Sequence, residues 1–133
     1  QRGLLSATIE VKGRKLLFAS THLDHRPDPA ERVSNVEEIK QFVSRQTTPV
    51  ILAGDFNDYP DRPVHSELKT VFLDAWEQAG VGDGFTISSD EPRARIDYVF
   101  LSPTNQWNVV SANVVTSDAS DHLPLVVEAI LNE

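Results

Sequence analysis

Carboxylate, amide and imidazole side chains follow apolar segments at four points of this sequence. They are His22 with Asp24, Asp55 with Asn57, Asp97, and Asp121 with His122. Strand ends are rigid supports, and the loops that leave them usually carry the site of a sheet protein. Because these residue types can hold a cation, position a water or transfer a proton, the repetition predicts one site assembled from distant parts of the chain.

Asp55 and Asn57 lie two residues apart in Ala-Gly-Asp-Phe-Asn-Asp. A carboxylate and an amide that face one way can present oxygen atoms to a divalent cation or to an attacking water. Gly54 permits a close approach of the backbone. A turn is the competing interpretation, because Gly, Asp and Asn cap loops through local hydrogen bonds, and these residues alone leave both open.

Asp97 interrupts a run of strand-forming residues, where a carboxylate is costly unless it has a partner. His122 is the candidate, since an aspartate that accepts from one imidazole nitrogen fixes the tautomer and leaves the other nitrogen for a proton or a phosphoryl oxygen. Residues 117–122 are also compatible with a solvated turn, and Pro124 restricts the backbone before it. His22, taken alone, fits a structural histidine better than a catalyst.

The first elements that must position these residues are two strands and a helix. Residues 4–11 and 15–23 are β-rich and flank a glycine, as expected of an antiparallel hairpin. A helix follows, with Asp28 as its N-cap, Pro29 at its first position and Glu31 completing a capping box. Apolar residues then recur at helical spacing at positions 30, 33, 36, 39 and 43, which predicts one buried face.

The remaining elements alternate between short strands and weak helices. A continuously apolar run, 49–53, predicts a central strand. Two weaker helical stretches follow, and the last third reads as three strands. The helical stretches are 64–69 and 73–79, and the strands are 96–101, 107–116 and 125–131. This order predicts an α+β fold with a mostly antiparallel sheet, covered by helices on one face and needing a partner layer on the other.

Composition limits the classes of function. The 133 residues suit one globular domain, and the net charge of −8 argues against tight non-specific binding to nucleic acid or anionic lipid. The lack of Cys excludes disulfides, zinc-thiolate sites and thiol catalysis. A soluble domain of open location is expected, because the sequence has neither a membrane-length apolar run nor a signal sequence. Gln1 and the absence of Met predict a processed chain or an excised fragment.

Four short motifs together carry a resemblance to a known group of proteins. They are Ser20-Thr21-His22-Leu23, Gly54-Asp55-Phe56-Asn57, Arg95-Ile96-Asp97-Tyr98-Val99-Phe100 and Ser120-Asp121-His122-Leu123-Pro124. In this order the chain resembles the endonuclease/exonuclease/phosphatase superfamily, the DNase I-like group that includes abasic-site endonucleases, inositol polyphosphate phosphatases and neutral sphingomyelinases. Each motif is weak alone, but all of them in order over nearly the whole chain are specific.

The resemblance implies a four-layer α/β/β/α sandwich, of which this sequence supplies about half. Residues 1–133 then correspond to the C-terminal portion of a single domain whose N-terminal portion is absent. Members carry a metal-binding Glu and an Asn in that first portion, and neither has a counterpart here. The isolated chain is therefore expected to be inactive or very weakly active.

The resemblance also implies roles for individual side chains. His122 would polarise or deprotonate the attacking water, with Asp97 orienting its ring. Asp55 and Asn57 would align the nucleophile and stabilise the transition state. His22 would contact the scissile phosphate or assist the leaving oxygen.

The implied cofactor is a divalent cation. Asp121 would lie beside His122 near the metal, so the expected ligands are Asp55, Asn57 and Asp121. Mg²⁺ is the usual metal of the group and suits oxygen ligands, with Mn²⁺ and Ca²⁺ as alternatives.

The resulting prediction is a metal-dependent phosphoesterase that hydrolyses phosphate mono- or diesters by in-line attack of water. Small or lipid-derived esters are favoured over nucleic acid, because the chain has no basic stripe with interleaved aromatics. A non-catalytic scaffold or binding module is the alternative. The Gly-Asn-His motif of calcineurin-like phosphatases and the His-then-Asp order of HD phosphohydrolases are missing. The uncovered sheet face predicts a complementary N-terminal half or self-association as a partner.

Overall fold

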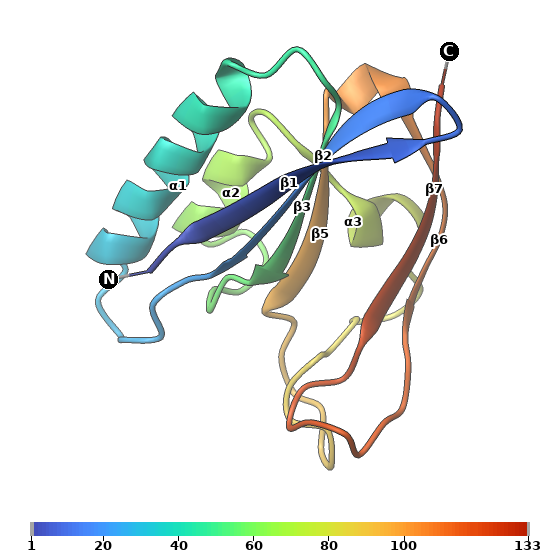
Figure 1. Cartoon of the computed structure of the whole chain (residues 1–133). Helices are drawn as coiled ribbons and strands as arrows, with labels where there is room; N and C mark the ends of the chain where they lie inside the picture. The colour runs from blue at the N-terminus through green and yellow to red at the C-terminus, as the bar shows by residue number, and fades with distance from the viewer. Residues whose placement is uncertain (1, 133) are drawn as a thin grey trace.

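A computed structural model describes residues 2–132 and shows a mixed α+β fold (Figure 1). The elements in chain order are β1 (Leu4–Val11), β2 (Arg14–His22), α1 (Ala30–Ser44), β3 (Val50–Asp55), α2 (Pro63–Leu68), β4 (Leu73–Asp74), α3 (Ala75–Ala79), β5 (Asp97–Ser102), the 3₁₀ turn η1 (Thr104–Gln106), β6 (Trp107–Val114) and β7 (Leu125–Leu131). The predicted fold class is confirmed. None of the helices within residues 2–132 has the length and apolar character needed to cross a bilayer.

A five-stranded sheet in the order β1-β2-β3-β5-β4 forms the centre of the described chain. Strands β2 and β3 are parallel, and the other neighbours are antiparallel. Parallel neighbours need a long crossover, which α1 provides. The mostly antiparallel character is therefore as predicted, with one parallel pair at the centre.

Strands β6 and β7 form a separate two-stranded sheet, whereas the sequence pattern suggested a single sheet. After β5 the chain turns through η1, and β6 with β7 crosses the opposite face of the main sheet (Figure 1). There Trp107 packs with Leu16 and Leu101. The apolar alternation of these strands was read correctly, but it does not say which sheet a strand joins.

Helix α1 lies on the other face and buries Val36, Ile39 and Val43, as its periodicity predicts. Its start differs from the prediction. The helix begins at Ala30, whose backbone N–H donates to Asp28 Oδ1 at 3.0 Å. The predicted capping box does not form, because Glu31 pairs with the guanidinium of Arg26 instead.

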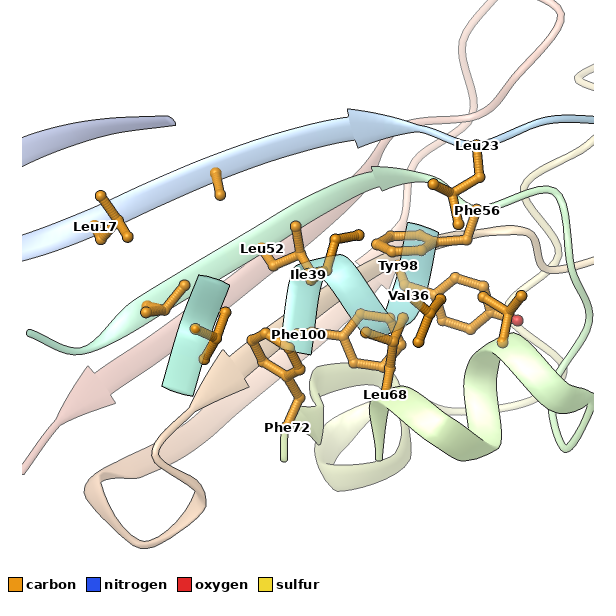
Figure 2. Packing of buried hydrophobic residues seen from close by; sticks show 14 residues of the cluster. Leu17, Leu23, Val36, Ile39, Leu52, Phe56, Leu68, Phe72, Tyr98 and Phe100 are labelled. Carbon is orange, nitrogen blue, oxygen red and sulfur yellow. The ribbon is translucent and has the colours of Figure 1, made fainter. Parts of the chain in front are cut away.

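An aromatic core lies between this face of the sheet and the helices α1 and α2 (Figure 2). Phe56 meets the ring of Tyr98 edge-on at a centroid distance of 5.7 Å and that of Phe100 at 5.3 Å, and Tyr98 and Phe100 stack at 5.3 Å. Such pairs add to the free energy gained from burial alone. Since Phe56 follows β3 and Tyr98 belongs to β5, the cluster fixes the ends of these two strands.

Within the described residues the second face of the main sheet is covered only in part, by β6, β7 and α3, whose Ala75 belongs to the same cluster as Trp107. The prediction that the helices cover one face alone is therefore wrong for α3. Leu5, Ile9, Val11 and Phe18 on β1 and β2 remain exposed, with Leu5 78% accessible. A groove of about 540 Å³ runs from Val11 and Phe18 to Trp107. The chain itself thus covers part of the face for which the sequence predicts a partner layer, and the partner stays a prediction.

The middle of the chain holds the least accurate predictions. The stretch 73–79, predicted as helical, begins with the two-residue strand β4 and continues as α3. Strand β4 pairs with β5 through Leu73 and Leu101. A strand of two residues has no periodicity to detect, which explains the difference.

Candidate active site

His22, Asp55 and Asp97 form one row across β2, β3 and β5. In the strand register His22 lies opposite Asp55, and Asp55 lies opposite Asp97. Alternation along β3 buries Val50 and Leu52 under the helices, so Asp55 belongs to the opposite, partly open face. The register therefore makes neighbours of three residues that are distant in sequence.

His122 joins this row from the loop before β7. Its Nδ1 lies 2.8 Å from Asp97 Oδ2, with both side chains about three-quarters buried. The carboxylate accepts the Nδ1 proton, so Nε2 is the nitrogen available for chemistry. The Asp97–His122 pair predicted from the sequence is present in the structure.

The carboxylates of the row repel each other, and burial adds to the cost of their charges. Burial raises the pKa of Asp55, and the charge of Asp97 adds to this effect against the opposing hydrogen bond from Asn57. Burial by itself would lower the pKa of His122, but the hydrogen bond and charge of Asp97 outweigh it, so the pKa is raised. Neighbouring carboxylates of this kind are stabilised when a cation is close.

Asp55, Asp97 and His122 each place a ligand atom within 4.8 Å of the others. Two carboxylates and an imidazole are a donor set that suits a divalent cation. This group shares Asp55 with the set predicted from the sequence, and Asp121 lies outside it.

Asn57 locks the loop that carries Asp55. It has a positive φ of 49°, which asparagine tolerates. Its backbone N–H donates to Asp55 Oδ1 at 2.8 Å, and its side-chain amide donates to the Leu23 carbonyl at 3.0 Å. Asp55 is thus a turn residue and a member of the row at once. The turn interpretation of this motif is confirmed, and the role of Asp55 and Asn57 at a cation or an attacking water stays a prediction.

Two further candidates lie apart from the row. The exposed Asp121 accepts a hydrogen bond from Ser120 at 3.2 Å and lies outside the group of possible ligands that contains Asp55. Asp24 is buried, and its Oδ2 accepts from Arg26 Nε at 2.7 Å. That hydrogen bond is the main reason why the pKa of Asp24 is lowered. Asp24 therefore stabilises its own loop.

Gly54 allows β3 to approach β2 directly beneath the row. A Cβ atom at this position would lie 1.9 Å from the carbonyl oxygen of Thr21, a distance that side chains cannot adopt. The close approach suggested by the sequence is confirmed at the pair that precedes His22 and Asp55.

A buried network behind the row escaped the sequence analysis. The fully buried His65 accepts the Asp61 N–H at Nδ1 (3.0 Å), and its Nε2 donates to Asp74 Oδ2 at 2.9 Å. Arg95 donates to the same oxygen at 2.7 Å. Asp61, His65 and Glu77 also have the spacing of metal ligands, but both ring nitrogens of His65 are already bonded, so the network is structural.

Tyr98 ties this network to the loop of Asp55. Its hydroxyl lies between the carbonyls of Asp58 at 2.9 Å and Arg95 at 3.0 Å, and can donate to either. Burial raises the pKa of Tyr98 far above its usual value, so the hydroxyl stays a donor. The only sequence signal for the network was Arg95, a charge next to buried strand residues.

The sequence of this chain matches a known family over most of its length. The sequence profile described as the endonuclease/exonuclease/phosphatase family covers residues 2–122. The chain belongs to this family. The four motifs that carried the resemblance lie within, or end just beyond, the matched range.

The chain is similar to proteins known by sequence and to proteins of solved structure. The UPF0294 protein plu0699 of Photorhabdus laumondii is 36% identical over 80 residues, which are 59% of this chain and 28% of that protein. A mannosyl-6-phosphatase of Bacteroides thetaiotaomicron is 26% identical with a TM-score of 0.73, over 90% of this chain and 53% of its own.

A crystal structure from Bacteroides vulgatus supports the fold alone. It is 22% identical with a TM-score of 0.86, and the match covers 98% of this chain and 56% of that one. The chain thus spans little more than half the length of these solved family members.

Proposed function

We propose that the protein to which this chain belongs is a divalent-metal-dependent hydrolase of phosphate esters. The observation that carries the proposal is the Asp97–His122 pair beside Asp55, at the end of a row that includes His22. A histidine with one nitrogen fixed by a carboxylate, next to a possible cation site, suits the activation of water for attack on phosphorus. Membership of a family named for nucleases and phosphatases supports the same reaction.

The chain's own residues have distinct tasks in this reaction. Water attacks phosphorus in line with the ester oxygen, and the proton that it loses goes to Nε2 of His122. Asp97 keeps the ring oriented and stabilises its charged form. His22, which lies 3.3 Å from Asp55, contacts a phosphate oxygen or protonates the departing ester oxygen. Asn57 holds the Asp55 loop in place for this alignment.

Mg²⁺ is the proposed cofactor, and Asp55 is its proposed central ligand. Asp55 belongs both to the set expected from the family resemblance, with Asn57 and Asp121, and to the group that the structure places together, with Asp97 and His122. When bound, the cation would neutralise charge on the phosphate. Mn²⁺ and Ca²⁺ are the alternatives that the same oxygen ligands accept.

A small or lipid-derived phosphate ester is the proposed substrate class. The net charge of −8 disfavours a polyanion, and the similar Bacteroides thetaiotaomicron protein is a sugar phosphatase. Monoesters and diesters are both compatible with the row. Nucleic acid serves as the contrasting substrate in the test.

We propose further that the open sheet face receives more protein, either the remaining portion of the domain or a second copy of this chain. Leu5, Ile9, Val11 and Phe18 form an exposed apolar surface on the face to which the row belongs. Solved family members extend well beyond the matched portion. The isolated chain should accordingly be inactive or very weakly active.

The test is hydrolysis of p-nitrophenyl phosphate, bis-p-nitrophenyl phosphate and a short DNA, with Mg²⁺, Mn²⁺ or EDTA. This chain is compared with the longer parent protein and its His122→Ala variant. His25→Ala is the matched control, since His25 is an exposed histidine of a neighbouring loop. Metal-dependent activity that only His122→Ala abolishes supports the proposal. A folded parent that is inactive on all esters and binds no metal is instead a non-catalytic scaffold.

A further inference from the structure

Thr86 touches both chain segments that carry the catalytic pair. It is fully buried, with 0% of its surface accessible. Its carbonyl accepts the backbone N–H of Leu123, the residue after His122, at 2.7 Å. Its hydroxyl oxygen accepts from the backbone N–H of Asp97 and of Ile96, each at 3.4 Å.

The N–H of Asp97 needs an acceptor outside the β3–β5 ladder. The carbonyl of Ile96 accepts from Phe56 beside β3 at 2.9 Å. This carbonyl and the N–H of Asp97 belong to the same trans peptide unit and therefore point in opposite directions. The N–H of Asp97 is thus turned away from β3, toward the side where β4 pairs with β5.

Strand β4 does not reach that far. Its two residues pair with Leu101 and Phe100, several positions beyond Asp97. The hydroxyl of Thr86 supplies to the Asp97 N–H the acceptor that a backbone carbonyl would supply if β4 were longer. Without it, the part-buried N–H of Asp97 would lose its acceptor, and unpaired backbone donors away from water are rare in native structures.

The segment around Thr86 is itself held between the two loops. Thr86 N–H donates to the Ala94 carbonyl at 2.7 Å, and Ile87 forms isolated bridges with Ala94 and His122. Ser89 N–H donates to the Asp121 carbonyl at 2.8 Å. These backbone bonds hold Thr86 in place, while its hydroxyl is the side-chain group that reaches the strand carrying Asp97.

We propose that Thr86 is a positioning residue for the Asp97–His122 pair. Its hydroxyl fixes the backbone under Asp97 and its carbonyl fixes the backbone after His122, so the 2.8 Å contact between Asp97 Oδ2 and His122 Nδ1 is set before substrate arrives. Thr86 acts through Asp97 and does not touch the reacting atoms. Preset geometry of this kind lowers the entropic cost of reaching the transition state.

A pair of substitutions separates the hydroxyl from the shape of the side chain. Thr86→Val keeps the volume and removes the oxygen that accepts from Asp97. Thr86→Ser keeps the oxygen and removes a methyl group. If Thr86 served packing alone, the serine variant would be the more damaged of the two.

The first measurement is the proton NMR resonance of His122 Nδ1–H in this chain, in EDTA. A proton held by a carboxylate exchanges slowly and shifts far downfield. We expect to see the resonance in the unmodified chain and in Thr86→Ser. We expect it to be lost in Thr86→Val while the fold stays unchanged. Retention in a folded Thr86→Val overturns the inference. If that variant does not fold, Thr86→Ala takes its place, and if neither folds the residue serves the fold and the inference fails.

The second measurement rests on the proposed function and uses the longer parent protein. Thr86→Val should lower kcat on the order of tenfold to a hundredfold, because small displacements of catalytic groups have effects of that size. KM should stay within about twofold, and Thr86→Ser should restore kcat. An unchanged kcat in Thr86→Val overturns the inference. An inactive parent defeats the proposed function instead, and the NMR result then decides Thr86 by itself.

Discussion

His22 and Asp55 lie opposite each other on neighbouring parallel strands, with Nε2 of the histidine 3.3 Å from Oδ2 of the carboxylate. The contact depends on the register of β2 and β3, in which the preceding pair, Thr21 and Gly54, leaves no room for a Cβ atom. The site is therefore sensitive to backbone changes that touch none of its side chains.

Asp97→Asn should lower the pKa of His122, because the carboxylate's hydrogen bond and charge are what raise it against the effect of burial. Hydrolysis by the longer parent should fall on the order of a hundredfold or more. The pKa is measured by NMR titration of the His122 ring in EDTA. Asp118→Asn, in an exposed part of the same loop, should change neither quantity. An unaltered pKa in Asp97→Asn would show that the pair does not form in solution.

Asp55→Asn should weaken Mn²⁺ binding at least about tenfold, since one charged ligand is lost. Paramagnetic broadening of the His122 ring signals in this chain reports the binding. Asp121→Asn decides between the two ligand sets: unchanged broadening favours Asp55 with Asp97 and His122, and weakened binding favours Asp55 with Asn57 and Asp121. Equal broadening in wild type and Asp55→Asn would refute Asp55 as the central ligand.

Gly54→Ala should destabilise the chain by about 3 kcal/mol or more, a size reached when backbone must move. The added Cβ would lie 1.9 Å from the Thr21 carbonyl oxygen. Urea unfolding gives the free energy. Gly3→Ala is the matched control, because an added Cβ there meets nothing within 4 Å. Similar stabilities for the two variants would mean that β2 and β3 lie further apart than described.

The free energy of unfolding should depend on pH through Asp74. Burial favours its neutral form, but hydrogen bonds from His65 and Arg95 outweigh burial and lower its pKa below 3.8. The folded pKa is thus below the unfolded one, so the stabilisation is fully present above the unfolded pKa and is lost as pH falls through the folded pKa.

Asp74→Asn should therefore flatten the loss of stability at acidic pH. It should also cost about 3–5 kcal/mol at neutral pH, because Arg95 stays buried without its anion. Thermal or urea unfolding, repeated from neutral pH down to the pH at which the chain unfolds, measures both effects. Asp83→Asn, an exposed aspartate, provides the comparison. If Asp74→Asn lost stability with falling pH as steeply as the unmodified chain does, Asp74 would not be the cause of the acid sensitivity.

Phe18→Glu should reduce self-association of the isolated chain. Phe18 belongs to the open apolar face and is 40% accessible, and burying a carboxylate in a contact there is unfavourable. Light scattering after size exclusion gives the oligomeric state. Val81→Glu, at an exposed apolar residue of the loop after α3, is the comparison. A monodisperse monomer of the unmodified chain would contradict the expected association.

The parts of the fold that the sequence predicts best are those with clear periodicity. The boundaries of β1 and β7 agree with the expected ones, and α1 buries the expected face. Strand β4 and the separate sheet of β6 and β7 were missed. The first is too short to show a pattern, and the second depends on tertiary packing that local alternation does not encode.

The site shows the same division. The Asp97–His122 pair follows from the rule that a carboxylate among strand residues needs a partner. The residue that holds the pair in place, Thr86, gives no such signal, because a threonine before a strand is an ordinary strand former. Its importance arises from the direction of one peptide N–H, which only coordinates reveal.

The row of His22, Asp55 and Asp97 also constrains the order in which the site can assemble during folding. Its members lie on strands joined by a crossover and by a long excursion through α2, β4 and α3. Such pairings close large loops and form slowly compared with hairpins. On a growing chain His22 and Asp55 emerge well before Asp97 and His122, so the row and its histidine partner come together only after the later strands have docked.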